Sequence, residues 1–536
     1  MRKWHGNPWA ILITLSLGFF MTLLDLTIVN IAMPSMIDQL HASLDEILWV
    51  INAYVLILAV LLITAGRLGD VRGQRTIFIF GVATFTVASL LCGISQNPAE
   101  LIAARCVQGL GAAMLLPQTM AIIIATFPPQ RRGAALGIWG AVAGVAAIAG
   151  PTLGGFLVSA FDWRWIFFVN LPVGVVVLIA AFAVIPPVRQ ERQHRLDLGG
   201  VLIATAALFC LSFALTEGQR YDWNIWIWGL VAAAVVLLVV FLLQQRTQQD
   251  NEPLVPFALF RDRNFTVINF VAAAVSVGMI GMFLPLTIYL QSVLGYSALK
   301  SGLVMAPMSV ISMFVAPFAG RLSDRIGGKF ILMGGLTLYG IAMAWIVLIA
   351  EPTTNWPAFW PALIIAGLGI GCVFAPMATE AMRGIEPRMA GAASGVYNTI
   401  RQIGSVVGSA AMGAVLQNQL ASSLQHEATV RAGQLPAQAR EPFLAGAKKA
   451  AQGGLEVGAG QNGATQNVPK GLPKEVGDQI ARAFKAVFDH GFVTAMKPTM
   501  ALPIVVVLVA AVSCLIMKRY VRPAEPQPTE PVEASA

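Results

Sequence analysis

The chain alternates between long apolar stretches and short polar turns along most of its length. Each apolar stretch runs for roughly 20 residues, which is the length an α-helix needs to cross a hydrocarbon core of about 30 Å. This pattern predicts an all-α polytopic membrane protein with fourteen transmembrane helices. We expect the spans at about residues 9–33, 45–66, 76–95, 100–127, 134–159, 164–184, 199–216, 225–243, 265–291, 300–319, 330–350, 357–382, 392–416 and 499–517.

One polar turn occurs twice. Gly66–Arg75 reads GRLGDVRGQR, and Gly320–Lys329 reads GRLSDRIGGK at a spacing of 254 residues. Both copies lie between apolar stretches, so each is expected to be a short turn at the end of a span. Internal repeats of this kind are common in secondary transporters. The repeat predicts two similar halves of six helices with two further helices between them.

Composition supports a membrane protein. The 536 residues are 57% hydrophobic and 12% charged, with a mean hydropathy of +0.72, whereas soluble domains carry roughly 25% charged residues. The short alternating segments of a membrane β-barrel do not occur in the sequence. A soluble protein and a barrel are therefore excluded.

The distribution of basic residues predicts the orientation. Most Lys and Arg residues fall in the two tails and in the turns after even-numbered spans, while the short turns on the other side hold only Arg164, Arg220 and Lys300. By the positive-inside rule both termini are cytoplasmic. The net charge of +8 then faces the anionic inner leaflet, and no nucleic-acid partner is expected.

These observations predict the division of the chain. Residues 9–184 form an N-terminal six-helix bundle, residues 185–264 a two-helix linker with flanking cytoplasmic segments, and residues 265–517 a C-terminal six-helix bundle. We expect the tail 518–536, which is rich in Pro and Glu, to be a disordered cytoplasmic segment.

The C-terminal bundle contains a long polar segment, 417–498, which the topology places outside the membrane. Within 473–497 the side chains of Ile480, Phe484, Val487 and Phe488 share one helical face, so an amphipathic helix is expected. It would cap the outer mouth or lie on the lipid surface; the Gly-rich part 453–471 is alternatively a disordered loop. We expect the segment to modulate transport without performing it.

Metal, cofactor and enzymatic chemistry are not indicated. The five cysteines lie in apolar stretches without a CxxC pair, and the five histidines are scattered. No HExxH or GxSxG motif occurs. We expect no metal site, no cofactor and no catalytic residue.

Charges inside spans are few, and such residues are functional candidates. Asp25 is the one carboxylate deep within an apolar span, about 12 Å from its outer end at 1.5 Å per residue. Arg105 lies at a similar depth, so the two form a pair if their helices are neighbours; a structural salt bridge is the alternative. Arg401 is expected near the midplane without an acid at its depth. Glu380 is the nearest candidate, as an entrance residue or as a simple inner-leaflet charge.

The fifth span contains closely spaced glycines. Gly140, Gly144, Gly150, Gly154 and Gly155 are expected to clear side chains from one surface of the helix and so permit close helix contact. Pro151 removes a backbone donor and is expected to bend the helix. Ordinary membrane packing is the alternative interpretation of this stretch.

Several motifs in order resemble the major facilitator superfamily. The repeated turn is similar to its GxLxDrxGrr motif. Five further segments resemble the fourteen-helix drug:proton antiporters, the EmrB/QacA-type branch. They are LDLTIVNIAMP (Leu24–Pro34), RCVQGLGAA (Arg105–Ala113), GPTLGG followed by WRWIFFVNLPVG (Gly150–Gly155 and Trp163–Gly174), and GAASGVYNTIRQIGSVVG (Gly391–Gly408).

The resemblance implies a major facilitator fold and roles for these residues. Asp25 and Arg105 would couple proton and substrate, with Glu380 and Arg401 as secondary candidates. Gly150, Pro151, Gly154 and Gly155 would form the antiporter helix bend. The repeated turns would be conformational latches, with Asp70 facing residues 391–393 and Asp324 facing residues 132–135. The latch residues are Gly66, Asp70, Gly73, Arg75, Gly320, Asp324 and Gly327.

The function implied is proton-coupled export of amphiphilic or drug-like molecules across the plasma membrane by alternating access, with the proton gradient as energy source. The partners implied are lipophilic small molecules, protons and the bilayer. Two alternatives remain open: a dedicated exporter of one lipid or metabolite with the same fold, and a membrane sensor or scaffold that uses residues 417–498.

Overall fold

The computed structural model describes residues 4–187, 197–218, 220–249, 253–386, 389–433, 440–441, 443–446 and 474–519, and these residues form helices and turns without a strand. The polar tail 520–536 and the Gly-rich stretch 453–471 lie outside the described residues. The helices are α1 (Pro8–Leu40), α2 (Leu44–Arg72), α3 (Gln74–Ile94), α4 (Pro98–Thr126), α5 (Arg132–Ala160), α6 (Trp165–Phe168), α7 (Asn170–Val184), α8 (Leu198–Glu217), α9 (Ile225–Thr247), α10 (Ala258–Arg261), α11 (Arg263–Ile288), α12 (Ala298–Ile326), α13 (Lys329–Ile349), α14 (Trp360–Met382), α15 (Ala390–Ala432) and α18 (Lys474–Ser513).

Twelve helices in the described part of the chain are long and apolar enough to cross a membrane. The expectation of fourteen differs by α5 and α15. The described apolar stretch of α5 is shorter, Arg132–Ala146, and α15 is rich in Gly, Ser and Ala, with charged residues toward its far end. Both helices nevertheless pack inside the bundle, α5 against α1 and α12 and α15 against α2 and α11.

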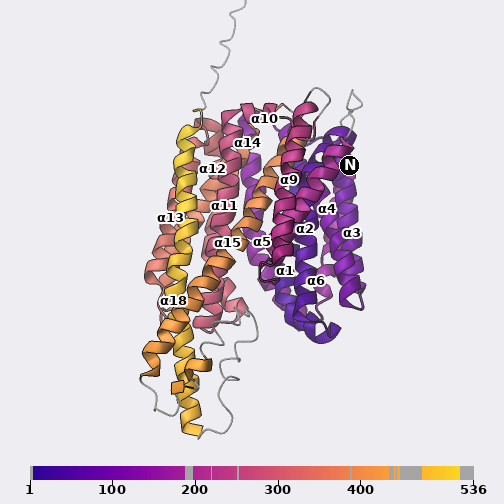
Figure 1. Ribbon diagram of the computed structural model, residues 1–536. Coiled ribbons are helices and arrows are strands. Elements are labelled where there is room, and N and C mark those ends of the chain that lie inside the picture. The colour runs from indigo at the N-terminus through magenta and orange to yellow at the C-terminus, as the bar shows by residue number, and fades with distance from the viewer. Residues whose placement is uncertain are drawn as a thin grey trace, which may run out of the picture.

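The helices form one elongated bundle in which both ends of the described chain lie on the same face (Figure 1). We call this the terminal face, and the other end of the bundle the opposite face. α3 and α2 pack on α4, and α13 and α12 pack on α14, so equivalent helices of the two repeats make equivalent contacts. The repeats meet where α5 packs against α12 and α2 against α15.

Local sequence fixes many of the helix starts. The Asn7 and Asn97 side chains accept from backbone N–H groups at the starts of α1 and α4, and Ser43 and Glu46 form a capping box on α2. The two repeated turns are made by Gly73 and Gly327, whose φ angles are +96° and +87°. Residues other than glycine rarely adopt this backbone conformation, so these positions require glycine.

α8 and α9 lie beside the bundle, as expected for a linker pair, and α8 contacts both α2 and α15. At the terminal face Asp197 accepts hydrogen bonds from the backbone N–H of Gly200 and the side chains of Gln244 and Gln245. Partial burial alone would raise the pKa of Asp197, but these hydrogen bonds outweigh it and hold the pKa below its ordinary value. Asp197 therefore stays ionised and ties α8 to α9.

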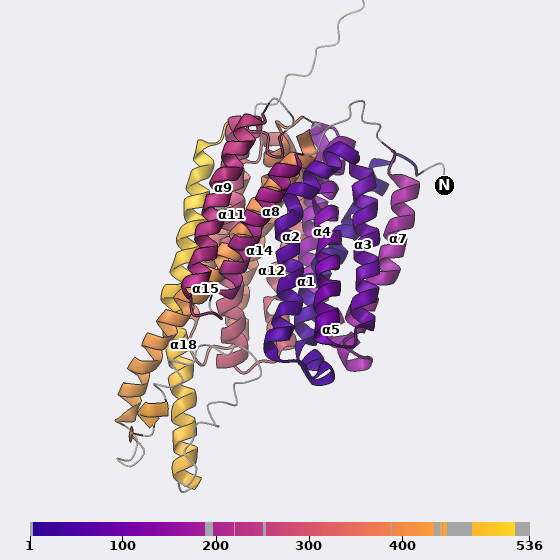
Figure 2. The same cartoon turned by 45° about the vertical axis from the view of Figure 1, so that its right-hand side comes forward.

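The polar segment 417–498 differs from the expectation. α15 continues to Ala432 and α18 already begins at Lys474, so both helices project together beyond the others on the opposite face (Figures 1 and 2). The expected amphipathic helix is therefore the first part of α18. Its apolar side chains do not cap the bundle or lie free on a lipid surface: Ile480, Phe484 and Val487 are buried in a cluster that includes Leu424 and Ala428 of α15.

Candidate functional site

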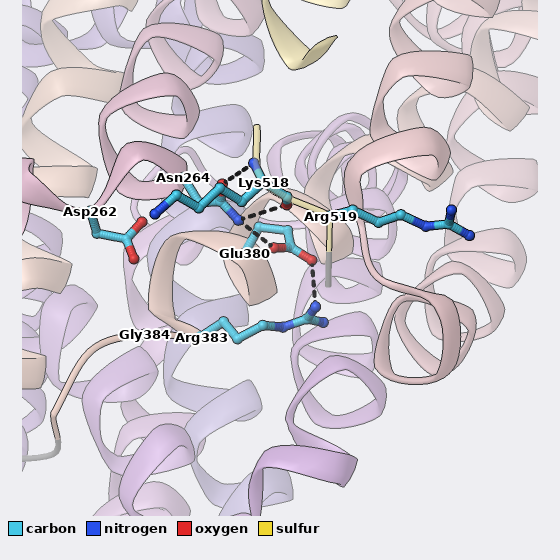
Figure 3. A pocket seen from close by; sticks show the side chains of 7 residues that line it. All are labelled: Asp262, Asn264, Glu380, Arg383, Gly384, Lys518 and Arg519. Atoms are coloured by element: carbon cyan, nitrogen blue, oxygen red, sulfur yellow. Dashed lines mark hydrogen bonds and ion pairs between the residues drawn. The ribbon is translucent and has the colours of Figure 1, made fainter. Parts of the chain in front are cut away.

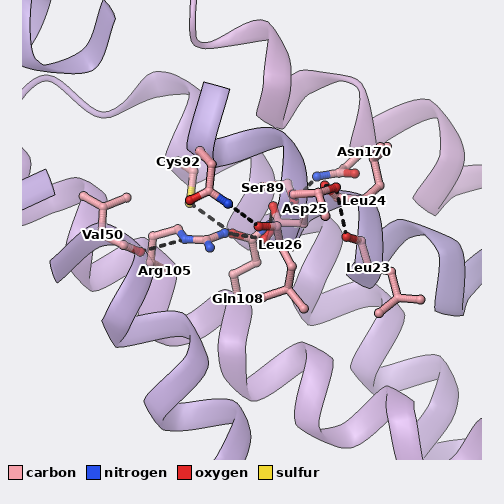
Figure 4. Close-up of polar contacts among 12 residues, drawn as sticks. Leu23, Leu24, Asp25, Leu26, Val50, Ser89, Cys92, Arg105, Gln108 and Asn170 are labelled. Carbon is pink, nitrogen blue, oxygen red and sulfur yellow. Dashed lines mark hydrogen bonds and ion pairs between the residues drawn. The ribbon is translucent and has the colours of Figure 1, made fainter. Parts of the chain in front are cut away.

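The deepest polar cluster of the N-terminal repeat is built around Asp25 of α1 and Arg105 of α4 (Figure 4). Arg105 Nη1 lies 2.5 Å from Asp25 Oδ2, and the two side chains are 1% and 0% exposed. The sequence predicts that this pair is geometrically possible, and the structure brings the two residues together. In a low-dielectric environment such a pair requires additional hydrogen bonds, because both charges have lost their water.

Gln108 supplies those hydrogen bonds to both charges. It lies one helical turn after Arg105, donates from Nε2 to Asp25 Oδ1 (2.9 Å) and to Ser89 Oγ (2.9 Å), and accepts from Arg105 Nη1 at 2.7 Å. Gln108 belongs to the segment RCVQGLGAA, but the sequence alone did not indicate a role for it. Its spacing of three residues from Arg105, which places both on one helix face, was the signal available.

Arg105 also has neutral partners. Its Nε donates to the backbone oxygen of Val50 at 3.0 Å, and its guanidinium carbon lies 4.3 Å from the Tyr54 ring centroid. A cation over an aromatic face is stabilised electrostatically. Arg105 therefore keeps a carbonyl, an amide oxygen from Gln108 and an aromatic face if Asp25 becomes neutral, so this cluster could tolerate a change in the charge of Asp25.

The repeated turns form two matched contacts between the repeats at the terminal face. The backbone N–H groups of Gly391 and Ala392 donate to Asp70 Oδ1 and Oδ2 at 2.9 and 2.7 Å. The structure thus places Asp70 against the start of α15, within the range that the sequence predicts. A carboxylate at a helix N-terminus is stabilised by unpaired N–H groups and by the helix dipole.

The second copy repeats this geometry. The N–H groups of Gly133 and Ala134, at the start of α5, donate to Asp324 Oδ1 and Oδ2 at 2.7 and 2.9 Å. We call the pair of contacts the Asp70 latch and the Asp324 latch. Each therefore joins a repeated turn of one repeat to a helix start of the other.

Two glycines allow the backbones to approach so closely at the latches. A Cβ atom at Gly66 would overlap the backbone oxygen of Gly391, and one at Gly320 would overlap that of Gly133. Even an alanine would push the repeats apart. Arg75 has a different role: its Nη2 donates to the backbone oxygen of Phe182 at 3.1 Å, which ties α3 to α7 within one repeat.

The burial of α15 changes beyond the latch. Every residue from Gly391 to Thr399 is buried and residues 400–403 are half-buried; further along, Gly404, Val406 and Gly408 are buried while Val407 and Ser409 are exposed. Contact with the N-terminal repeat continues at least to Ile403, which packs against the cluster of Leu56, Val60 and Leu208.

Glu380 does not meet Arg401. It forms an ion pair with Arg383 at 2.9 Å and accepts from the backbone N–H of Gly328 at 2.6 Å. Glu380 thereby fixes the turn that follows the Asp324 latch. Of its two expected roles, entrance residue and simple inner-leaflet charge, these structural contacts near the terminal face favour the second.

Glu380 also borders a small pocket at this face (Figure 3). Asn264 links α11 to the last described residues, because it bonds to both the backbone oxygen and the N–H of Lys518. The side chains that line the pocket are Asp262, Asn264, Glu380, Arg383, Lys518 and Arg519, together with Gly384.

Arg401 lies alone within α15. Its recorded hydrogen bond is a long one, 3.4 Å from Nη2 to Asn398 Oδ1, and its side chain is half-buried. Among the described residues no acidic side chain forms an ion pair with it. The structure therefore does not bring Arg401 and Glu380 together, and their role as secondary coupling residues stays a prediction.

The glycines of α5 do not form one contact surface, which corrects the expectation. Cβ atoms at Gly150 and Gly154 would overlap Thr27 and Ile28 of α1, whereas one at Gly144 would approach the backbone of Ser309 on α12. Gly155 faces open space. Pro151 lies in α5 without a described side-chain environment, so the bend stays a prediction.

No group of His, Cys, Asp and Glu side chains suited to a metal ion occurs among the residues that the structure describes.

A comparison with protein families decides the identity of the fold. The profile of the Major Facilitator Superfamily matches residues 15–409. The chain belongs to this superfamily. As a Major Facilitator Superfamily protein with many apolar helices, it is a multi-pass transporter of the plasma membrane and not an enzyme.

Two relatives and one solved structure place this transporter more closely. An MFS-type transporter of Mycobacterium tuberculosis is 40% identical over 455 residues, 83% of this chain and 78% of the relative. The tetracenomycin C resistance and export protein of Streptomyces glaucescens is 33% identical over 419 residues, 78% of this chain and 77% of the relative. The crystal structure of the human organic anion transporter MFSD10 matches with a TM-score of 0.56 at 13% identity, covering 94% of this chain and 99% of that one, which shows the fold alone.

Proposed function

We propose that this transporter is a proton-coupled antiporter that exports amphiphilic, drug-like molecules by alternating access. In this proposal both termini are cytoplasmic, so the terminal face is the inner face. α5 and α15 complete fourteen spans, arranged as six helices in residues 9–184, two in 185–264 and six in 265–517. The substrate pathway lies between the two six-helix bundles.

The observation that carries the proposal is the buried Asp25–Arg105–Gln108 cluster inside a bundle held together at one face by two latches. Buried ionisable groups in a membrane are costly and mark proton or substrate pathways. Two latches that join the repeats at the inner face are what an outward-facing state requires at that face. The name of one relative, the tetracenomycin C resistance and export protein, supports antibiotic-like substrates.

The cluster suggests how a proton would be handled. Asp25 accepts from both Arg105 and Gln108, as an anion does. Protonation of Asp25 removes its attraction to Arg105, which keeps its neutral partners. The weakened link between α1 and α4 then permits the rearrangement that opens the inner face. One charge that crosses a potential of 100 mV supplies roughly 2.3 kcal/mol, which corresponds to about a fifty-fold concentration ratio.

Transport by the purified full-length protein in proteoliposomes tests this proposal. Three aromatic probes cover the possible charges: anionic 8-anilino-1-naphthalenesulfonate, neutral N-phenyl-1-naphthylamine and cationic ethidium. We expect an imposed pH gradient to drive accumulation of at least one probe, and nigericin, which collapses the gradient, to abolish it.

Asp25→Asn should retain exchange of that probe without a gradient but lose accumulation with one. Asp38→Asn, at an exposed position on the same helix, is the matched control and should behave as the wild type. Absence of gradient-driven accumulation of every probe by the folded wild-type protein would contradict the proposed function. Undiminished accumulation by Asp25→Asn would move the proton site elsewhere.

A further inference from the structure

Arg401 is a cation deep in the membrane whose charge is not matched by an acid among the described residues. It follows the start of α15 at Ala390 by eleven residues, which is about 16 Å at 1.5 Å per residue. Its recorded bond to Asn398 is long and to a neutral group. The two acids that the sequence places inside spans form ion pairs with other arginines, Asp25 with Arg105 and Glu380 with Arg383.

The side chain of Arg401 lies on the face of α15 that meets the N-terminal repeat. Ser394 Oγ donates to the backbone oxygen of Pro117 on α4 at 3.0 Å, and Asn398 Nδ2 donates to the backbone oxygen of Ser394. Positions spaced by three, four and seven residues share a helix face. Arg401 follows Asn398 by three residues and Ser394 by seven, so it continues the same face toward the opposite face of the bundle.

Further along, the same face of α15 packs on its own repeat. Gly404 and Gly408, three and seven residues after Arg401, pack directly on the backbone of α11 at Ala273 and Val277. Arg401 therefore lies where this face passes from contact with α4 to contact with α11, at the boundary between the repeats. Burial decreases at this level, because Thr399 is buried and Arg401 is half-buried.

A half-accessible guanidinium at this depth suits an anionic ligand. A charged side chain within a membrane is expensive unless it faces a cavity or finds a partner. The planar fork of Arg binds carboxylate and related oxyanions through two parallel hydrogen bonds. The uncommitted N–H groups of Arg401 are donors of this kind.

We propose that Arg401 is a substrate-binding residue and that this transporter exports aromatic organic anions, which carry a carboxylate or sulfonate. This inference rests on the proposed export function and adds the charge of the substrate. The depth of Arg401 favours a free organic anion over a lipid phosphate, since headgroups remain at the membrane surface.

Comparing the transport of two probes that share one carbon skeleton tests the inference. 8-Anilino-1-naphthalenesulfonate and N-phenyl-1-naphthylamine differ by the sulfonate group, so their ratio of initial transport rates isolates the charge. We expect wild type to prefer the sulfonate. Arg401→Gln should lower that preference by about tenfold or more, the factor expected for losing one charge-assisted hydrogen bond, and should change transport of the neutral probe less than about twofold.

Two variants separate binding from structure. Arg401→Lys keeps the positive charge and should retain part of the sulfonate preference. Arg431→Gln is the matched control. Arg431 lies on the same helix as Arg401, in the part that projects beyond the bundle, and pairs with Glu427. Its replacement should leave the sulfonate preference unchanged. Vesicles with and without anionic lipid distinguish the ligand source: a preference that disappears only when anionic lipid is present would assign Arg401 to a lipid headgroup and overturn the inference.

The response of transport to membrane potential provides a second measurement, because it reports the charge of the exported probe. Exchange of one anion for one proton moves two positive charges inward, whereas exchange of a neutral probe moves one. An inside-negative potassium diffusion potential should therefore stimulate export of the sulfonate more strongly than that of the neutral probe. Equal handling of both probes by a wild-type protein that transports them would refute the inference but leave the proposed function intact; transport of neither probe nor of ethidium would refute both.

Discussion

At the scale of single residues, Gln108 supplies hydrogen bonds to the buried ion pair of Asp25 and Arg105. Its amide donates to one charge and accepts from the other, so it satisfies groups that the ion pair alone leaves unpaired. Gln108→Leu keeps the approximate volume and removes both hydrogen bonds. We expect a loss of about 1–3 kcal/mol in stability, the usual cost of leaving buried polar partners unsatisfied.

Thermal unfolding of the purified protein, followed by the reactivity of its buried cysteines, measures this loss. Gln96→Leu is the control, because Gln96 is exposed and its replacement should stay within about 0.5 kcal/mol. Equal midpoints for Gln108→Leu and the wild type would mean that Gln108 does not support the pair.

At the scale of elements, the two latches should set the balance between inward-facing and outward-facing states. Asp70→Asn and Asp324→Asn each keep the size of the side chain but remove its charge and one of two acceptor positions. A carboxylate at a helix N-terminus contributes about 0.3–1 kcal/mol when exposed and up to about 2 kcal/mol when partly buried. Each variant should therefore shift the equilibrium several-fold away from the closed inner face, and the double variant should shift it further.

Spin labels at Arg72 and Arg325, which are exposed positions at the ends of α2 and α12, report this balance. Distance distributions should gain a longer component in each single variant and more of it in the double variant. Distributions that match the wild type in all three variants would contradict the latch account.

Elements also show where sequence reasoning succeeded. The repeated motif located both turns, because a positive φ requires glycine at Gly73 and Gly327, and it indicated the helix starts that Asp70 and Asp324 meet. It missed the length of α15 and α18. Polar composition suggested a loop after residue 416, whereas tertiary contacts between Leu424 and the apolar face of α18 continue both helices beyond the membrane.

Side-chain pairing was predictable only in part. Depth along a span predicted that Asp25 and Arg105 could pair, because both lie at similar distances from one membrane surface. The same reasoning found no acid at the depth of Arg401 but could not identify the partners of Glu380. Glu380 bonds to the N–H of Gly328, a backbone group whose position depends on the packing of α13 and α14 and carries no sequence signal.

At the scale of the whole molecule, the account joins a proton site in one repeat to contacts between the repeats. Asp25 is sealed within the N-terminal repeat, so substrate between the repeats affects it through movement of α1 and α4 and not by touching it. If proton and substrate oppose one another, thermodynamic linkage requires that binding of one weakens binding of the other by the same factor. Substrate binding must then release protons.

Proton release on substrate binding is the measurement that tests this central claim most directly. The purified full-length protein is placed in a weakly buffered solution with a pH-indicator dye, and 8-anilino-1-naphthalenesulfonate or N-phenyl-1-naphthylamine is added, whichever the protein transports. We expect the wild type and Asp38→Asn to release on the order of one proton per transporter, and Asp25→Asn, which carries no titratable group at that position, to release none while still binding the probe. Equal proton release by Asp25→Asn and the wild type would contradict the account and make Glu380 the next residue to test.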